Sequence, residues 1–181
     1  MKETPRRFPP VADSSRLIAC LMDVERHVSS AGWDQPARLF ALVTTGTLLE
    51  VEPQLRGRVP ETAPDALTAI EQDEFHATDN LFERLHTIFW PDTVEGCAIA
   101  LERAFLPPKF EADLPEDPDA AAEFVAKHPE KTDVRVVVGV LRDGTKHGLA
   151  RLVSDPDDLL GAEDLVPGLA EGLLDTFRSE D

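Results

Sequence analysis

The sequence predicts an α+β fold, with a mostly antiparallel sheet of about five strands flanked by helices. Three observations lead to this class. Apolar residues recur at helical spacing near both ends of the chain, short β-rich runs lie between them, and the dipeptide Asp143-Gly144 joins two such runs. The predicted order is helix, two strands, helix, strand, helix, two strands, helix, which is typical of a sheet covered by helices.

The first part of the chain predicts one long helix and two strands. Residues 13–32 carry their apolar side chains on one helical stripe, and Gly32 is placed to end that helix. Residues 37–45 and 66–75 are rich in β-compatible residues and predict strands. Between the two strands, residues 46–57 predict one or two helical turns.

The stretch HTIFWPDTVEGCAIALERAFLPP, residues 86–108, resembles a reactive site more than any other part of the chain. A short helix over residues 80–89 should end at Trp90-Pro91, because a residue before proline disfavours helical backbone. From residue 96 to 107 both faces of the chain are apolar, which predicts a buried central strand. The stretch is therefore interpreted as a helix, a turn and a core strand. Its cysteine, Cys97, is expected to be buried and unreactive.

The second part of the chain contains the clearest turn signals. Asp117 followed by Pro118 is a favourable start for a helix over residues 119–129. Residues 134–153 predict a hairpin that turns at Asp143-Gly144. Residues 161–177 predict a closing helix.

Length and composition are those of one soluble domain. The chain has 181 residues, of which 42% are hydrophobic and 29% charged. We expect residues 1–12 to form a disordered, proline-rich arm and residues 13–181 to form a single domain. No apolar run is long enough to cross a membrane. Two cysteines without a CxxC spacing favour a reducing, cytoplasmic location.

The net charge of −17 limits the choice of partners. Residues 154–181 alone contain nine acidic side chains and one basic side chain. A field of this sign repels phosphate backbones, so no nucleic-acid partner is expected. It favours a basic protein partner.

One polar cluster is the best candidate for chemistry. Asp79, Glu83 and His86 share a helical face, and Glu83 and His86 have the spacing of half a di-iron site. The chain has no second motif of this kind, and apolar residues occupy the other side of the predicted helix. Glu74 and His76 lie on one side of a predicted strand end and could act as an acid/base pair. A solvated polar face is the favoured interpretation of all five residues, with no metal and no cofactor.

A face of small side chains is the best candidate for a contact surface. Gly96, Ala98 and Ala100 alternate along the predicted central strand and would allow another element to approach closely. A two-residue hairpin loop would add Gly139 and Gly148 as opposite neighbours, whereas a longer, bulged loop would shift their register by one. A packed helix is the favoured cover, from this chain or from a second copy in a homodimer, and a ligand is the alternative.

The common nucleotide-binding and hydrolase motifs do not occur in the sequence. No complete catalytic set is recognisable. The sequence therefore favours a non-enzymatic protein-interaction domain, of an adaptor or chaperone-like kind. The alternative is a small metal-dependent or acid/base enzyme that uses the cluster from Glu74 to His86.

Two resemblances accompany this interpretation. The predicted element order resembles the type III secretion chaperone-like fold, with one helix inserted between the second and third strands. The stretches PARLFALVTTGTLL, FWPDTVEGCAIALERAFLPP and VRVVVGVLRDGTKHGLARL resemble a family of uncharacterised actinobacterial proteins. That resemblance implies signature positions at Trp90-Pro91, Gly96-Cys97 and Glu102-Arg103, and it implies no activity.

Overall fold

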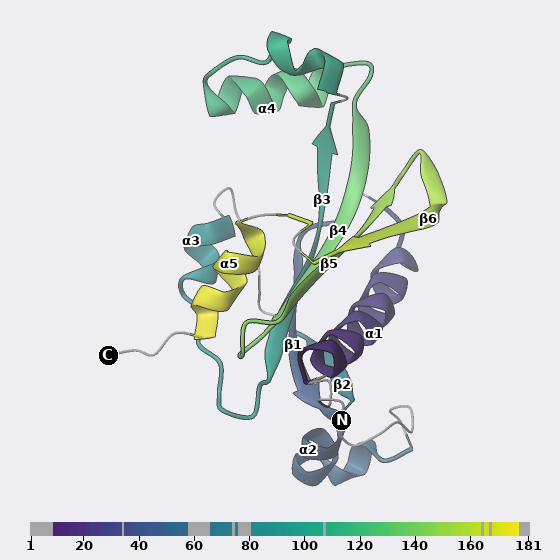
Figure 1. Ribbon diagram of the computed structural model, residues 1–181, viewed down its shortest axis with the longest axis vertical. Helices are drawn as coiled ribbons and strands as arrows, with labels where there is room; N and C mark the ends of the chain where they lie inside the picture. The colour runs from purple at the N-terminus through teal and green to yellow at the C-terminus, as the bar shows by residue number, and fades with distance from the viewer. Residues whose placement is uncertain are drawn as a thin grey trace, which may run out of the picture.

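In the residues that the computed structural model describes, six strands form one antiparallel sheet, which confirms the α+β class (Figure 1). The structure describes residues 9–33, 35–57, 66–73, 75, 81–106, 108–163, 165–166 and 168–177. The strands are β1 (Arg38–Thr44), β2 (Leu67–Glu71), β3 (Gly96–Phe105), β4 (Thr132–Leu141), β5 (Lys146–Leu152) and β6 (Asp155–Ala162). Their spatial order is β2-β1-β3-β4-β5-β6, so β2 and β6 are the edge strands.

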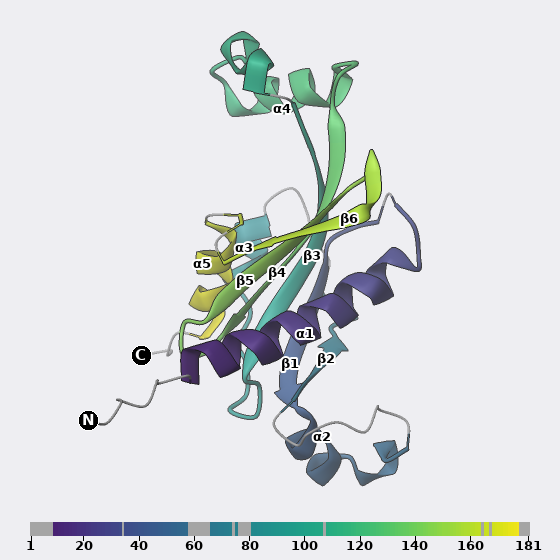
Figure 2. The same ribbon diagram turned by 45° about the vertical axis from the view of Figure 1, so that its right-hand side comes forward.

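Within the described residues, five helices and three short 3₁₀ turns connect and cover the strands. The helices are α1 (Pro9–Ser29), α2 (Thr45–Val51), α3 (Leu81–Leu85), α4 (Pro118–Lys127) and α5 (Leu169–Leu174). The 3₁₀ turns are η1 (Pro53–Leu55), η2 (Pro108–Asp113) and η3 (Asp175–Phe177). Helix α1 crosses one face of the sheet, whereas α3 and α5 lie on the other face (Figures 1 and 2).

Small side chains on the sheet allow α1 to pack closely. Ala98 and Ala100 of β3 are buried in one cluster with Leu17 and Leu21 of α1. A Cβ atom on Gly139 of β4 would lie 2.6 Å from Leu21 Cδ2, closer than van der Waals contact permits. The small-residue face is therefore covered by a helix of this same chain.

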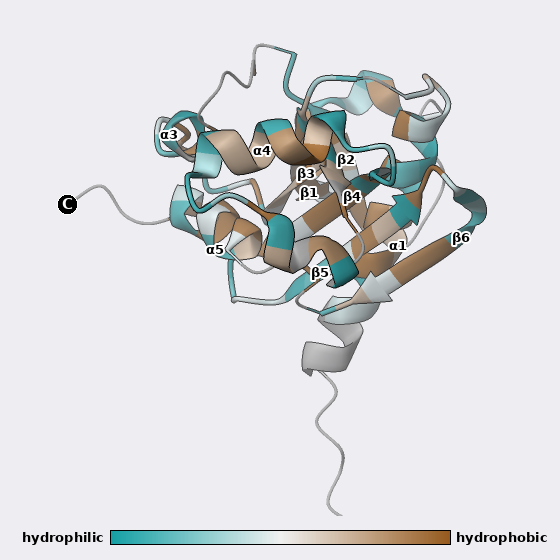
Figure 3. Cartoon of the chain, turned by 90° about the horizontal axis from the view of Figure 1, so that it is seen from above, coloured by the Kyte–Doolittle hydropathy of each residue, from teal (hydrophilic) through white to brown (hydrophobic). Residues whose placement is uncertain are grey.

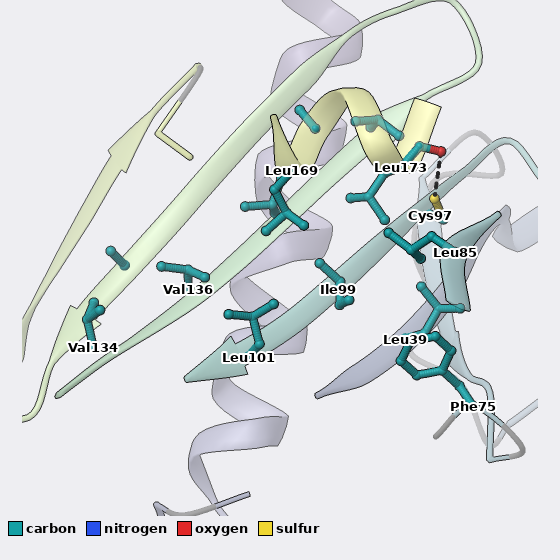
Figure 4. Packing of buried hydrophobic residues seen from close by; sticks show 14 residues of the cluster. Leu39, Phe75, Leu85, Cys97, Ile99, Leu101, Val134, Val136, Leu169 and Leu173 are labelled. Atoms are coloured by element: carbon teal, nitrogen blue, oxygen red, sulfur yellow. Dashed lines mark hydrogen bonds between the residues drawn. The ribbon is translucent and has the colours of Figure 1, made fainter. Parts of the chain in front are cut away.

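The opposite face is packed by α5. Leu169 and Leu173 lie over Val136, Ile99 and neighbouring side chains of the central strands (Figure 4). Cys97 is fully buried there, as predicted, and its Sγ lies 3.8 Å from the carbonyl oxygen of Leu173 and 3.7 Å from Thr176 Oγ1. Burial raises the pKa of the Cys97 thiol to about 12.

The hairpin turns at Asp143-Gly144 as predicted, but with the shifted register. Gly144 has φ +98° and donates its N–H to the carbonyl of Leu141, whose own N–H bonds to Thr145 O. Gly148 therefore pairs with Val138, and Gly139 pairs with His147. Gly139 and Gly148 are not opposite each other and point to different faces of the sheet.

The strand count of about five is wrong by one, because β6 was not predicted. Its sequence, DPDDLLGA, combines proline and three aspartates and has the composition of a loop. As an edge strand it needs few buried side chains, and only Leu159 and Ala162 are partly buried. The predicted closing helix over 161–177 is correspondingly shorter, with its α-helical part confined to α5.

Two further boundaries differ from prediction. Helix α1 begins at Pro9 rather than at residue 13, while residues 1–8 lie outside the described residues. Helix α3 ends at Leu85 rather than at Phe89.

The β3–β4 pair extends beyond the rest of the sheet and carries α4 at its end (Figure 1). Figure 3 shows hydrophilic and hydrophobic residues alternating along α4, none of which is buried.

Candidate functional site

A groove of about 630 Å³ runs between one flank of α1 and the edge strand β2. Residues on that flank recur every three or four positions, so the helical period places them along one wall. Strand β2 and its neighbour β1 supply the floor and the other wall. The lining residues are Cys20, Asp23, Val24, Arg26, His27, Ser30, Phe40, Leu67, Thr68, Ala69 and Glu71.

The inner surface of the groove is apolar. Val24 and Phe40 are almost fully buried, and Leu67 and the half-buried Ala69 of β2 pack against the same cluster. Cys20 is the ionisable group in this inner layer. Its burial, followed by the charge of Asp23, raises the pKa of the thiol to about 12. The thiol is therefore neutral near pH 7 and behaves as a small apolar side chain.

Charged side chains close one end of the groove with an ion pair. Arg38 donates two hydrogen bonds of 2.7 Å to the carboxylate of Glu71. These bonds hold the pKa of Glu71 below its ordinary value, although burial acts in the opposite direction. His27 Nε2 lies 3.1 Å from Arg38 Nη2 and 3.8 Å from Glu71 Oε1. The rim therefore has nearly balanced charge.

A buried polar network fixes α1 against the sheet behind the groove. Ser29 donates to Glu25 at 2.7 Å, and Arg151 of β5 binds both oxygens of Glu25 at 2.6 and 2.9 Å. Burial raises the pKa of Glu25, but the hydrogen bonds from Arg151 and Ser29 outweigh it and lower the pKa below its ordinary value. Arg135 of β4, 1% exposed, donates to Ser29 Oγ at 2.9 Å and to Glu102 at 3.3 Å.

The same Arg135 binds the end of the helix. It donates to the carbonyl of Gly32, and its guanidinium lies 4.3 Å from the centre of the Trp33 ring. Gln35 continues the network by donating to Val28 O and Gly32 O and by accepting from Arg38 at 2.8 Å. Because β5, β4, β3 and β1 all contribute to this network, α1 forms a rigid wall for the groove.

The outer edge of β2 presents backbone groups that β1 does not use. Thr45 N donates to Ala66 O, and Gln72 N donates to Leu39 O, each at 2.8 Å. In an antiparallel pair, hydrogen-bonded and non-hydrogen-bonded residues alternate. The odd-numbered residues of β2 therefore direct their N–H and C=O groups away from β1: Leu67, Ala69 and Glu71. No other strand in the described part of the chain pairs with this edge.

A second hollow of about 300 Å³ lies at the same edge on the other face of the sheet. It is lined by Val51, Ile70, Trp90 and Pro91 among others. Val51 and Ile70 are two of the large apolar side chains that remain exposed. Trp90 is held in place because its Nε1 donates to Thr176 Oγ1 at 2.8 Å. Within the 86–108 stretch, Trp90 thus packs against the η3 turn, and Trp90 and Pro91 border this hollow.

Two of the five residues in the polar cluster selected from the sequence lie in the described part of the chain. Glu83 and His86 are exposed at α3, while Glu74, His76 and Asp79 lie outside the described residues. Within the described ranges, no three His, Cys, Asp or Glu side chains are grouped so that they could hold a metal ion.

The small-residue positions are placed more clearly. Ala98, Ala100 and Gly139 lie under α1, and a Cβ on Gly96 would overlap the carbonyl oxygen of Val140. Gly148 lies on the other face, beneath Leu165.

The groove residues were not selected from the sequence. One signal was present, since Cys20, Val24 and His27 lie on one flank of the predicted first helix. The groove exists because β2 lies at the edge of the sheet, and the sequence does not show which strand is at the edge.

These features define an α+β protein with an open antiparallel sheet, one covering helix and a groove at the sheet edge. The chain belongs to the PPA1309-like protein family, whose family model matches residues 17–178. The matched range includes all the described residues that line the groove. Neither the search of curated proteins nor the search of solved structures gave a match. None of the helices in the described residues is both long and apolar enough to cross a membrane.

Proposed function

We propose that this protein is a non-enzymatic protein-interaction domain, of an adaptor or chaperone-like kind, and that its partner binds in the groove between α1 and β2. One observation carries the proposal: an apolar groove lies directly beside a strand edge whose outward backbone groups pair with no strand in the described part of the chain. Apolar grooves with a few fixed polar groups are the usual form of binding sites.

The chemistry of the groove supports binding rather than catalysis. The thiol at Cys20 has a pKa of about 12 and is therefore a poor nucleophile near neutral pH. The Glu71 carboxylate is engaged by Arg38, and Asp23 is paired with Arg26 at 2.9 Å. The hydrogen bonds from Arg38 lower the pKa of Glu71, so this carboxylate is a weak base.

The net charge supports a basic protein partner over a second copy of the chain. Two copies would each carry −17, and their fields would repel as they approached. A basic partner would be attracted and steered toward the surface. We also propose a cytoplasmic location, which the two reduced, buried cysteines support. The order of elements supports the chaperone-like comparison, and the resembling sequence stretches support an actinobacterial origin.

Selection from a random heptapeptide library displayed on phage would test the groove directly. The wild-type protein should enrich peptides that no longer bind Ala69→Trp, because the indole would fill the groove. Leu160→Trp is the matched control, since Leu160 is 44% exposed on β6 at the other edge of the sheet. The proposal is wrong if no peptide is enriched, or if enriched peptides bind all three proteins equally.

A further inference from the structure

We infer that the partner binds as an extended segment that pairs with β2 and becomes a further strand of the sheet. This inference rests on the proposed function and specifies the form of the occupant. The outward N–H and C=O groups of Leu67, Ala69 and Glu71 would form its backbone hydrogen bonds. Main-chain pairing of this kind supplies affinity, and side-chain pockets supply specificity.

The two edges of the sheet differ in a way that supports this inference. Edge strands of natural proteins are usually protected from pairing by proline, charge or irregularity. Strand β6 has such protection, since it contains Pro156 and three aspartates and pairs with β5 through a register shift. Strand β2, with the sequence LTAIE, has no proline and one charged residue, Glu71, which is held by Arg38. The β2 edge is therefore the one suited to accept a strand.

The groove determines which side chains the added strand carries. Residues of the added strand opposite Leu67 and Ala69 would point into the groove, because paired residues share a face of the sheet. Their surroundings would be the apolar side chains of Val24 and Phe40. Medium-sized apolar residues are therefore expected at these alternate positions.

The intervening side chains of the added strand would face the other side of the sheet. There they would lie next to Ile70, which is 37% exposed, and the hollow that Val51 and Trp90 border. Apolar residues are expected at these positions too. The occupant is thus a segment of about five apolar or β-branched residues, matching the length of β2.

Charge completes the description of the partner. The groove rim is nearly neutral because its acids are paired with arginines, so the core of the segment needs no charge. The chain as a whole has a net charge of −17, which favours Lys or Arg on either side of the apolar core. The proposed occupant is a short apolar strand with basic flanks, contributed by another protein.

Peptides enriched by the library described above would test the pairing with two measurements. Ala69→Pro removes one outward N–H but no hydrogen bond to β1, while Ala69→Val adds similar volume and keeps the N–H. Ala69→Pro should weaken peptide binding at least about tenfold relative to Ala69→Val, since a backbone hydrogen bond is lost.

The second measurement uses the wild-type protein and so does not depend on the fold of a variant. N-methylation of each peptide residue in turn should weaken binding at alternate positions only, because every second amide of an added strand faces β2. Binding that is uniformly insensitive to N-methylation, or equal in Ala69→Pro and Ala69→Val, would overturn strand pairing. If Ala69→Trp still abolished binding in that case, the groove would remain the binding site and only the strand inference would fail.

Discussion

At the scale of single residues, Arg135 shows how the groove wall is held. Its guanidinium contacts Ser29, Gly32, Trp33 and Glu102, so one side chain links α1 and its C-terminal turn to the sheet. Removal of one partner from a buried ion pair leaves the charge of the other partner buried and unpaired. This loss is far more costly than the loss of a surface pair.

Arg135→Met should therefore lower the free energy of unfolding by about 3–5 kcal/mol. The matched control is Arg26→Met, because Arg26 and Asp23 form an ion pair whose side chains are 73% and 70% exposed. That substitution should cost less than about 1 kcal/mol. Urea unfolding of the three proteins measures both values, and equal losses would show that the network does not hold the helix.

Cys97 gives a prediction that depends on pH. The pKa of the Cys97 thiol is about 12 in the folded chain, whereas the ordinary value for a cysteine thiol is 9.0. The stability contributed by the protonated thiol is therefore present below pH 9 and lost as the pH rises toward 12. Relative to Cys97→Ala, the wild type should lose about 2 kcal/mol between about pH 8 and about pH 10.5. A difference between the two proteins that stays constant with pH would mean that the folded thiol ionises normally.

At the scale of elements, two glycines allow close packing. Gly96 allows β3 to pair closely with β4, and Gly139 allows α1 to pack closely on β4. A methyl group on Gly96 would overlap the backbone oxygen of Val140, which the β3–β4 pairing holds in place. A methyl group on Gly139 would meet the ends of Leu21 and Leu17, which can shift.

We expect Gly96→Ala to cost about 3 kcal/mol or more and Gly139→Ala to cost about 1 kcal/mol. Both substitutions add one methyl group within a strand, so each is the control for the other. Chemical denaturation gives the two values. If Gly139→Ala lowered the free energy of unfolding more than Gly96→Ala, the contact between α1 and the sheet would tolerate an added methyl group less well than the β3–β4 pairing does.

The elements that the sequence predicted well are those with strong local signals. Residues 13–32 have a helical apolar stripe, Asp117 and Pro118 mark the start of α4, and Asp143-Gly144 requires a turn. Strand β6 was missed because its stability comes from pairing with β5 rather than from its own residues. The hairpin register was left open because it depends on the geometry of the turn.

The candidate site was harder to predict than the fold. The cluster from Glu74 to His86 was selected because its residues are close in sequence. The groove instead combines residues of α1, β1 and β2 that are up to about fifty positions apart. Which strand lies at the edge follows from the order of the whole sheet, and no local pattern encodes that order.

At the scale of the whole molecule, one open edge and one protected edge make the sheet asymmetric. The edge at β6 carries proline and aspartates, while the edge at β2 borders an apolar groove and a second apolar hollow. The chain as a whole has a net charge of −17, which disfavours self-association. These properties together support the proposal that the molecule accepts one strand from a basic partner at the β2 edge.

Amide hydrogen exchange at β2, followed by NMR with and without a selected peptide, tests this claim most directly. In the free protein, the amides of Thr68 and Ile70 should be protected by β1, whereas those of Leu67, Ala69 and Glu71 should exchange rapidly. Saturation with the peptide should slow exchange of the three outward amides at least about tenfold, because each gains a hydrogen bond. If the peptide binds to saturation and these three amides exchange as fast as before, the partner does not add to the sheet and the central claim is contradicted.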